Sequence, residues 1–530
     1  CISGSYYFAT RYAFTGCSIT AIQIHEPYQN KKHGHRSVVL KKNMSKIIWG
    51  VSANFHDAGL SVIKDGKIVF GAHSERYSGQ KHDKGLHINM IKEAIQYGMP
   101  DVVAWYEKPW KKNIRKMITK EYAYVGFEGS PAKYMKQFGI IAPVKTFDHH
   151  YSHAAAGAFT GPMNMGTVVV LDAIGEFLTC SVWEYSDTHG LKHLYNSRYP
   201  HSFGLLYSAF TLRCGLKPMD EEYITMGMAG WGKPIYKDKI KKDFIVSYHP
   251  FELKKNVHTG LGDYLPGADV MDIAASIQAV AEEFVVEYTK KAMVHTKFGN
   301  NHLIYQGGVA LNCVANSHIF DHADSVWIMP NPGDCGSSLG AALAEHGKRV
   351  KWPGPYIGTN IDNPYPVDAI IAELEANKIV GVASGRAEFG PRALGHRSLL
   401  ADPRGPEIKD QVNAIKRRQK FRPFAPAILK EHVNEYFDIC TDDSPYMQFV
   451  GKCKKPQEFP AIIHVDGTSR VQTVGKDDSP GFRALLEKWY KKTGCPMLLN
   501  TSLNIRGNPM VNTRKDADRF EDKYGIKVCS

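Results

Sequence analysis

Residues 167–185, TVVVLDAIGEFLTCSVWEY, decide the fold of this chain. An apolar run passes into a loop at residues 172–176, and a second run rich in β-branched and aromatic residues follows, which predicts two antiparallel strands. Residues 46–70 repeat the arrangement, with short apolar runs on both sides of a Lys64–Lys67 turn. A strand, a loop and a returning strand that occur twice indicate an internal duplication within an α/β fold.

His149 and His153 form the first candidate site. They lie four residues apart where an alanine-rich segment begins, so on a helix both imidazoles point toward the same space. Asp172 stands at the carboxyl end of the apolar strand, where open α/β sheets bind ligands. Two histidines and a carboxylate suit zinc, iron or manganese with coordination positions left for substrate, and Asp334 is the expected fourth ligand. The alternative is that the histidine pair forms a solvated helix face.

Composition and charge bound the class of protein. The chain has 66 Lys and Arg against 53 Asp and Glu, a net charge of +13, which favours phosphorylated substrates, nucleotides or nucleic acid as partners. The excess is spread along the chain, so the signal is weak. The ten cysteines form no CxxC pair, which argues against a disulfide framework, and no apolar run is long enough to cross a membrane. We therefore expect a cytoplasmic protein without membrane contact.

The pattern of apolar residues predicts two domains after an unpatterned start. Residues 1–43 lack the features of a secretory signal, and we expect them to be a non-native or disordered extension that precedes a start at Met44. Residues 46–350 would form the domain with the metal site. A stretch rich in proline and glycine makes residues 351–366 the expected linker, and residues 367–530 the second domain.

Glycines at strand-to-helix junctions indicate an anionic ligand in the first domain. Gly307 and Gly308 follow an apolar strand and lead to Asn312, and a second glycine-rich junction spans residues 332–342. Backbone N–H groups at such junctions approach phosphate groups closely, so we predict a nucleotide site beside the metal. The alternative is that the glycines only make tight turns.

Arginines dominate the second domain. Arg386, Arg392, Arg397 and Arg404 lie in a segment interrupted by glycine and proline, which suits the binding of phosphate oxygens by guanidinium groups. The basic run at residues 416–422 is typical of a solvated surface, but its proline-aromatic ending indicates a held loop. Hydroxyl and amide donors follow on an expected strand at residues 462–472 and in an expected loop at residues 499–504, and together these segments predict an anion-binding cavity.

Several ordered motifs together resemble a known family, the ATP-dependent O-carbamoyltransferases of the nodulation-protein and antibiotic-tailoring type. The resemblance covers about residues 46–515. Its motifs are HHxxHA at His149–Ala154, GGVALN at Gly307–Asn312, GRAEFGPRALGHRS at Gly385–Ser398, FRPFAP at Phe421–Pro426, DGTSRVQ at Asp466–Gln472 and NTSLN at Asn500–Asn504.

The resemblance implies a fold and a reaction. The first domain would be actin-like or sugar-kinase-like, similar to the tRNA threonylcarbamoyladenosine transferase subunit, and the second would be an α/β domain with a twisted mixed sheet, similar to threonylcarbamoyl-adenylate synthase. Carbamoyl phosphate and ATP, with Mg, would form carbamoyl adenylate in the second domain. The carbamoyl group would then pass to an acceptor hydroxyl at the metal of the first domain.

Roles for single residues follow from the resemblance. Nine residues of the second domain would bind phosphate or orient the carbamoyl group, namely Arg386, Arg392, Arg397, Lys416, Arg417, His464, Thr468, Arg470 and Asn500, with Arg392 and Arg397 acting catalytically. His56 would be the general base, in its neutral form near pH 7, although it could also only order the first hairpin loop. Ile224 stands where a family motif carries lysine, which puts adenylate contacts from that loop in doubt.

The acceptor stays open between three interpretations. Interleaved aromatic and basic residues at 105–115, with Lys145, Lys192 and Lys233, favour nucleic acid that carries 5-hydroxymethylcytosine. A sugar or antibiotic hydroxyl is the alternative, in which these residues are ordinary surface. A non-catalytic nucleotide- and metal-binding regulator is the third. The oligomeric state is not predicted.

Overall fold

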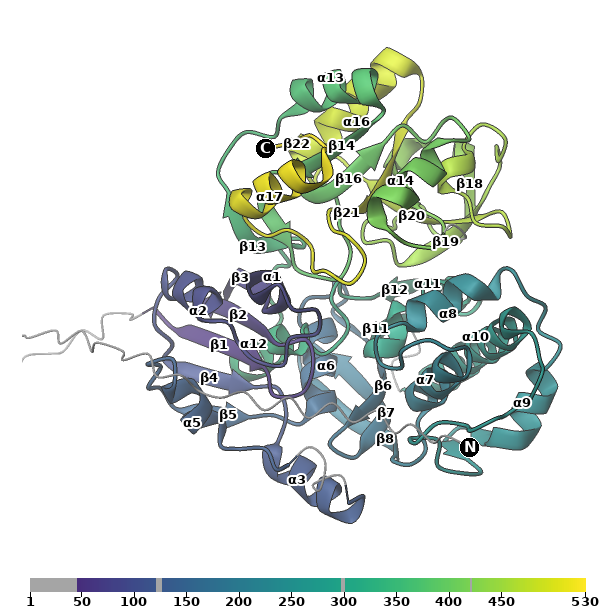
Figure 1. The fold of residues 1–530 in the computed structure, drawn as a ribbon. Coiled ribbons are helices and arrows are strands. Elements are labelled where there is room, and N and C mark those ends of the chain that lie inside the picture. Colours follow the sequence, from purple (N-terminus) through teal and green to yellow (C-terminus); the bar gives the residue numbers. More distant parts are fainter. Residues whose placement is uncertain (1–44, 121–125, 297–300, 420–421) are drawn as a thin grey trace, which may run out of the picture. The chain divides into compact units, whose positions relative to one another are not determined.

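The computed structural model describes residues 45–120, 126–296, 301–419 and 422–530, so the expected extension at 1–43 and Phe421 of the FRPFAP motif lie outside the described residues. The first strands are β1 (Ile47–Ser52), β2 (Gly59–Lys64), β3 (Lys67–His73), β4 (Val102–Trp105) and β5 (Val144–Thr146). They form a sheet in the order β3-β2-β1-β4-β5 (Figure 1). β1 pairs antiparallel with β2 and parallel with β4, while β3 and β5 extend the sheet at its two edges.

A second sheet repeats this topology. Its strands are β6 (Met165–Gly175), β7 (Leu178–Ser186), β8 (Gly190–Arg198), β11 (His302–Gln306) and β12 (Ser325–Trp327), in the order β12-β11-β6-β7-β8. β6 pairs antiparallel with β7 and parallel with β11, as β1 does with β2 and β4. The predicted duplication is therefore confirmed, and with it the two-lobed, actin-like and sugar-kinase-like architecture.

Two helices pack against each other between these sheets. α6 (His149–Ala158) packs on the second sheet, and α12 (Ser337–His346) packs on the first. The helices approach closely at Gly340, because a Cβ added there would lie 1.9 Å from the carbonyl oxygen of Ser152. This contact fixes the place where α6 begins, and α6 carries both predicted histidine ligands.

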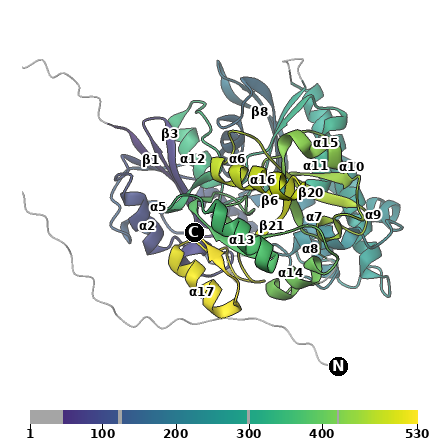
Figure 2. The same ribbon diagram turned by 90° about the horizontal axis from the view of Figure 1, so that it is seen from above.

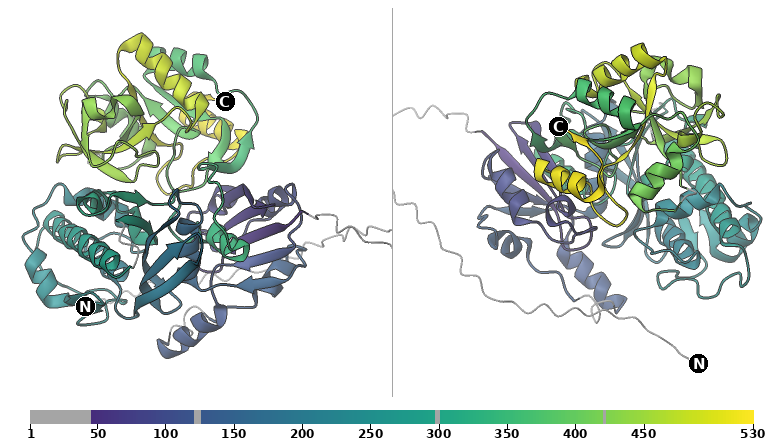
Figure 3. Two further views of the ribbon diagram at one scale, coloured as in Figure 1. Left: turned by 180° about the vertical axis from the view of Figure 1, so that it is seen from behind. Right: turned by 45° about the horizontal axis from the view of Figure 1, so that its top comes forward.

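The remaining helices of this region differ in how they pack. Those between β3 and α6 are α1 (Glu75–Ser78), α2 (Ile88–Ile95), α3 (Pro109–Ile118) and α5 (Pro131–Lys136), of which α1 contacts β3 and α2 contacts β2. Those after β8 are α7 (Phe203–Arg213), α8 (Glu222–Ala229), α9 (Lys237–Phe244), α10 (Val270–Val294) and α11 (Cys313–Ser317), with a small ribbon of β9 (Ile245–Tyr248) and β10 (Phe251–Leu253). α7 and α10 pack on β6, and α8, α9 and α11 pack on α10. The long α10 runs along the outer side of this layer (Figure 3) and shares a buried core with Val169 and Leu171 of β6.

Residues 379–529 form an eight-stranded mixed sheet, as the resemblance implied. Its order is β18 (Phe437–Ile439), β19 (Phe449–Cys453), β20 (Thr468–Val474), β17 (Ala425–Leu429), β21 (Met497–Ser502), β16 (Arg397–Ala401), β14 (Ile379–Ala383) and β22 (Val528–Cys529). The helices here are α13 (Val367–Asn377), α14 (Ile408–Lys416), α15 (Val433–Tyr436), α16 (Pro480–Thr493) and α17 (Arg514–Tyr524). α13 and α16 lie side by side (Figure 2).

Three details differ from the sequence-based expectations. Asp172 lies within β6, at a register irregularity between Leu171 and Gly175, and not in a loop after the strand. The expected strand at 462–472 begins only at Thr468, because residues 463–467 form the turn before β20. The predicted linker contains β13 (Tyr356–Ile361), which pairs with β15 (Gly385–Glu388), and the domain division itself stays a prediction.

Two expectations about the chain as a whole can be compared with the described residues. The cysteines among them are all free thiols. None of their helices combines the length and apolar character that crossing a bilayer requires.

The helix crossing can be tested at Gly340. Gly340→Ala should lower the free energy of unfolding by about 1–3 kcal/mol, because the new methyl group meets a backbone oxygen that cannot rotate away. Gly227→Ala in α8 is the matched control, since nothing lies within 4 Å of its added Cβ and alanine is the better helix former. The midpoint of urea unfolding measures both changes, and equal loss in the two variants would contradict the explanation.

Candidate metal centre and anion-binding cluster

Four buried side chains meet where α6 begins. His149 Nε2 lies 3.1 Å from His153 Nε2, 3.2 Å from Asp172 Oδ2 and 3.4 Å from Asp334 Oδ1, and His153 Nε2 lies 3.3 Å from the same Asp334 oxygen. Together the four groups place one donor atom each within 4.8 Å of one another. The structure thus brings together the four residues predicted as ligands.

Separate elements deliver these four groups. Residue spacing on α6 places the two histidines on one face, the irregularity in β6 turns Asp172 toward them, and Asp334 comes from the loop before α12. Gly308 donates its backbone N–H to Asp172 Oδ1 at 3.0 Å, so this junction holds a carboxylate. Gly307 has φ +94° and a Cβ there would lie 2.1 Å from the Leu171 carbonyl oxygen, which explains the glycine.

The donor set fits a divalent metal. Donors about 2.0–2.2 Å from one ion in tetrahedral geometry lie roughly 3.3–3.6 Å apart, close to the separations here. Burial opposes charge on His149, but Asp334 and Asp172 outweigh it and raise its pKa well above the usual value. Burial also opposes charge on Asp334 and so raises its pKa, but the neighbouring histidines outweigh burial and lower this pKa well below its usual value. Carboxylates that stay ionised and imidazoles that face them are the groups a cation would bind.

Further carboxylates surround His149 without joining this set. Glu176 accepts the backbone N–H groups of Lys108 at 2.7 Å and of His149, and burial raises its pKa to about 7. Glu107 Oε2 lies 4.0 Å from His149 Nδ1 and also accepts a hydrogen bond from Lys112. These contacts orient the start of α6.

His56 lies beside the four-residue cluster. Its Nε2 is 3.6 Å from Asp334 Oδ2, and its Nδ1 is 2.9 Å from Asp57 Oδ2. Burial lowers the pKa of His56, but Asp334 and Asp57 outweigh burial and raise it. A dication bound near these carboxylates would oppose this rise and favour the expected neutral imidazole.

A second cluster consists of five cationic side chains, those of Arg392, Lys416, Arg418, Arg422 and Arg470. Lys416 is buried, and the four arginines are half-buried. Burial lowers the pKa of each, and neighbouring arginines lower most of them further, so that the pKa of Arg392 falls to about 9. No carboxylate forms an ion pair with any of them within the described ranges, and Arg470 Nε is buried without a hydrogen-bond partner there. Positive charge that is partly withdrawn from water and has no acidic partners favours an anionic ligand.

The donors of two predicted phosphate ligands have backbone carbonyl partners. Arg397 is fully buried and donates to five backbone carbonyl groups, those of Asn512, Ser384, Gly385, His396 and Thr359. Arg386 donates to the carbonyl groups of Gly358, Ile357 and Val69. Their donors hold loops together because backbone acceptors from distant segments surround them. Arg404, in the same segment, pairs with Asp402.

The other predicted residues also have defined partners. Asn500 donates to Gln472 Oε1 at 2.7 Å and to the Ala393 carbonyl, beside the cationic cluster. His464 donates to the Gly227 carbonyl at 2.9 Å, and Thr468 donates to Asp466. Arg417 ends α14 and lies over the Tyr524 ring, and Asn312 caps α11 by accepting from Ala315. Ile224 is fully buried.

Arg418 and Arg422 belong to the cationic cluster although the sequence does not single them out. The basic run that contains them was the available signal, but it did not distinguish an inward side chain from a surface one. Arg418 packs over Phe424 and Arg422 over Tyr223, at 4.0 and 4.8 Å from the ring centres.

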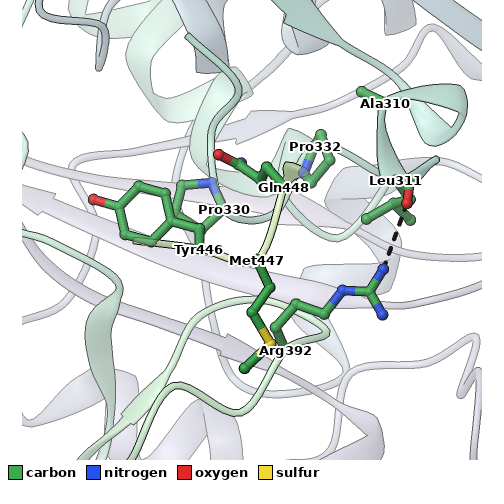
Figure 4. Close-up of a pocket in the computed structure, with 8 residues that line it drawn as sticks. All are labelled: Ala310, Leu311, Pro330, Pro332, Arg392, Tyr446, Met447 and Gln448. Carbon is green, nitrogen blue, oxygen red and sulfur yellow. Dashed lines mark hydrogen bonds between the residues drawn. The ribbon is translucent and has the colours of Figure 1, made fainter. Parts of the chain in front are cut away.

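A small cavity adjoins Arg392 (Figure 4). Its volume of about 10 Å³ is close to the least that holds one water molecule. Its lining includes Ala310 and Leu311 of the GGVALN motif, and Arg392 donates to the Leu311 carbonyl at 3.4 Å. Arg392 of the GRAEFGPRALGHRS motif thus contacts the GGVALN motif, whose Gly308 donates to Asp172.

Comparison with known proteins identifies the family. The carbamoyltransferase N-terminus model matches residues 104–343 and the carbamoyltransferase C-terminus model matches residues 371–529. Nodulation protein NolO of Bradyrhizobium diazoefficiens is 32% identical, over 70% of this chain and 75% of that protein. The chain belongs to the carbamoyltransferase family.

Further similarities accompany this assignment. The carbamoyltransferase is 32% identical to an uncharacterized protein of Synechocystis sp., over 89% of this chain and 93% of that one. Among solved structures, the (R)-2-hydroxyglutaryl-CoA dehydratase component A of Acidaminococcus fermentans has a TM-score of 0.35 and 14% identity, over 57% of this chain and 97% of that chain. Family membership makes the protein an enzyme of the transferase class.

The metal assignment can be tested by substitution. His149→Ala should remove bound iron, manganese or zinc, because one of four donors is lost and two carboxylates remain crowded. His150→Gln is the control, since His150 hydrogen-bonds Ser181 and burial lowers its pKa to about 3. Elemental analysis of the purified variants after metal loading gives the stoichiometry. Equal metal content in His149→Ala and the unaltered protein would refute the assignment.

Proposed function

We propose that this carbamoyltransferase forms carbamoyl adenylate from carbamoyl phosphate and ATP and transfers the carbamoyl group to an acceptor hydroxyl. The cationic cluster, which is half-buried or buried and has no acidic partner among the described residues, is the observation that carries this proposal. It suits two phosphorylated substrates that must lie side by side. The separate histidine and aspartate cluster suits the second step.

In the first step the cationic cluster would bind both substrates. Carbamoyl phosphate is hydrolysed to carbamate and phosphate, a carbamate oxygen attacks the α-phosphorus of ATP, and pyrophosphate leaves. Arg392, Arg418 and Arg422 would neutralise the negative charge that grows on the phosphate oxygens, with Mg bound to the ATP. Lys416 donates to Ser502 and Asn504, so it also holds the NTSLN motif, at the end of β21, near these arginines.

In the second step the acceptor hydroxyl attacks the carbamoyl carbon and AMP leaves. His149, His153, Asp172 and Asp334 would hold a divalent metal, which when bound supplies Lewis-acid stabilisation of negative charge. His56 would take the hydroxyl proton at Nε2, the ring atom that faces this cluster.

As acceptor we propose a small polyhydroxylated compound such as a sugar. The strip expected to bind nucleic acid is largely internal, because Trp105, Lys112 and Arg115 are at most 3% exposed. Its open side chains include Trp110, at 59%, and the apolar Ile114, at 42%. Lys145 pairs with Glu345 and Lys192 lies near Glu184. DNA with 5-hydroxymethylcytosine is the competing acceptor.

The two steps can be separated by substitution. Arg392→Ala should lower carbamoyl-phosphate-dependent pyrophosphate release by about 10- to 100-fold, as expected for the loss of a charged hydrogen bond. Arg404→Ala is the control, because Arg404 pairs with Asp402 outside the cluster. Release of pyrophosphate from ATP is followed directly. Equal rates for both variants and the unaltered enzyme would remove Arg392 from the site.

The acceptor class is tested with isotope-labelled carbamoyl phosphate, ATP and a divalent metal. The panel contains sugars, aminoglycosides, the free hydroxymethylated nucleoside and DNA with 5-hydroxymethylcytosine. Mass spectrometry should find the label in a small polyhydroxylated compound. Label in the DNA alone would overturn the small-acceptor assignment and leave the carbamoyl transfer intact.

A further inference from the structure

A chain of hydrogen bonds leads away from His56 on the side opposite Asp334. His56 Nδ1 lies 2.9 Å from Asp57 Oδ2, and His82 Nδ1 lies 2.7 Å from Asp57 Oδ1. His82 Nε2 lies 2.6 Å from Asp220 Oδ1, and Lys217 donates to Asp220 Oδ2 at 2.8 Å. Each Asp57 oxygen therefore accepts one imidazole N–H.

We propose that Asp57, His82 and Asp220 are positioning residues for His56, which hold its Nδ1 protonated and leave the Nε2 lone pair free for the acceptor hydroxyl. This inference rests on the proposed role of His56 as general base. A carboxylate that accepts from one imidazole nitrogen sets both the tautomer and the ring orientation, so the other nitrogen becomes the base. His82 in turn holds the Asp57 carboxylate in place through its own hydrogen bond to Oδ1.

The backbone around the chain is held in unusual conformations. Asp57 has φ +52° and His82 has φ +55°, a region that non-glycine residues seldom adopt. Two backbone hydrogen bonds tie their segments together, from Asn54 to the Lys84 carbonyl at 2.7 Å and from Ala58 to the Asp83 carbonyl at 2.8 Å. Surrounding structure thus maintains the local strain, as it commonly does at functional sites.

The charges in the chain support a fixed arrangement. Burial lowers the pKa of His82, but Asp220 and Asp57 outweigh it and raise the pKa to about 9. Burial raises the pKa of Asp57, yet its two histidine partners lower it below normal. A protonated His82 can donate to both aspartates at once, which a neutral imidazole cannot do.

A cation bound by Asp57, Glu75 and His82 is the competing explanation, since their donor atoms lie within 4.8 Å of one another. Protein donors already occupy these groups. Glu75 accepts from Lys81 and from the backbone N–H of His82, and both Asp57 oxygens face histidines. The hydrogen-bond chain accounts for all of these contacts without an ion.

Asp220 is followed by residues that contact Arg506 and Arg422. Glu221 accepts from Arg506 at 2.9 Å, and Arg422 of the cationic cluster packs over the Tyr223 ring. These contacts anchor the outer end of the chain. The position of Asp220, and through it that of His82, therefore does not depend on Lys217 alone.

Chemical rescue tests the proposal in the full chain. His82→Ala should lower kcat for carbamoyl transfer by about 10- to 100-fold, with the acceptor KM and pyrophosphate release unchanged. Added imidazole should restore kcat, because His82 borders a surface cavity of about 530 Å³ that also includes Lys81 and Gly507. His87→Ala is the control, because it removes a neighbouring histidine that is not part of the hydrogen-bond chain. This variant should carry out both steps at the rate of the unaltered enzyme, with or without added imidazole.

Asp57→Asn provides a second, nearly isosteric variant. It should lower kcat for transfer without lowering the thermal midpoint by more than a few degrees, and imidazole should not restore it. Wild-type transfer by both His82→Ala and Asp57→Asn would overturn the inference, as would equal loss of both half-reactions. His56→Ala separates the two levels of the argument. If it retains transfer, the proposed base fails, whereas loss in His56→Ala with full activity in His82→Ala refutes only the positioning role.

Discussion

The close packing of α6 against α12 is the constraint on which the rest of the structure depends. Backbone atoms meet at Gly340, where even a methyl group would lie 1.9 Å from the Ser152 carbonyl oxygen. α6 begins with the two histidines, and Asp334 lies immediately before α12. The same contact that joins the duplicated sheets therefore brings three of the four proposed metal ligands together. A residue larger than glycine at the crossing would separate the lobes and the ligands at the same time.

Two clusters of opposite character divide the chemistry. Near α6, carboxylates and imidazoles face one another and stabilise a positive charge between them. In the second cluster, five cations lack acidic partners among the described residues, and desolvation, with neighbouring arginines in most cases, lowers their pKa values. Such an arrangement is costly until an anion neutralises it. The contact between Arg392 and the Leu311 carbonyl shows that the segments carrying these clusters touch.

Buried ion pairs explain why positive charge along the chain is a poor guide to the acceptor. Lys112 and Lys116 of α3 bond to Glu107 and Glu128, and all of these side chains are at most 8% exposed. Their charges hold α3 to the protein and do not form a surface. The exposed part of this helix is instead apolar, with Trp110 at 59% and Met117 at 59%.

The sequence by itself determined the duplicated sheets, the helical spacing of His149 and His153, and the segments that hold positive charge. These features depend on local periodicity, since strand and helix geometry set which neighbours share a face. Tertiary structure decided which charged groups are available. Arg397 and Arg392 lie in the same motif. Arg397 donates to backbone carbonyl groups, among them those of Thr359 and Asn512, whereas Arg392 lies near Arg470 and Arg422. Tertiary structure also placed His82 between Asp57 and Asp220, although Asp220 lies 138 residues after His82 in the sequence. Hydrogen-bond partners of buried groups come from distant segments, so only the folded chain assigns them.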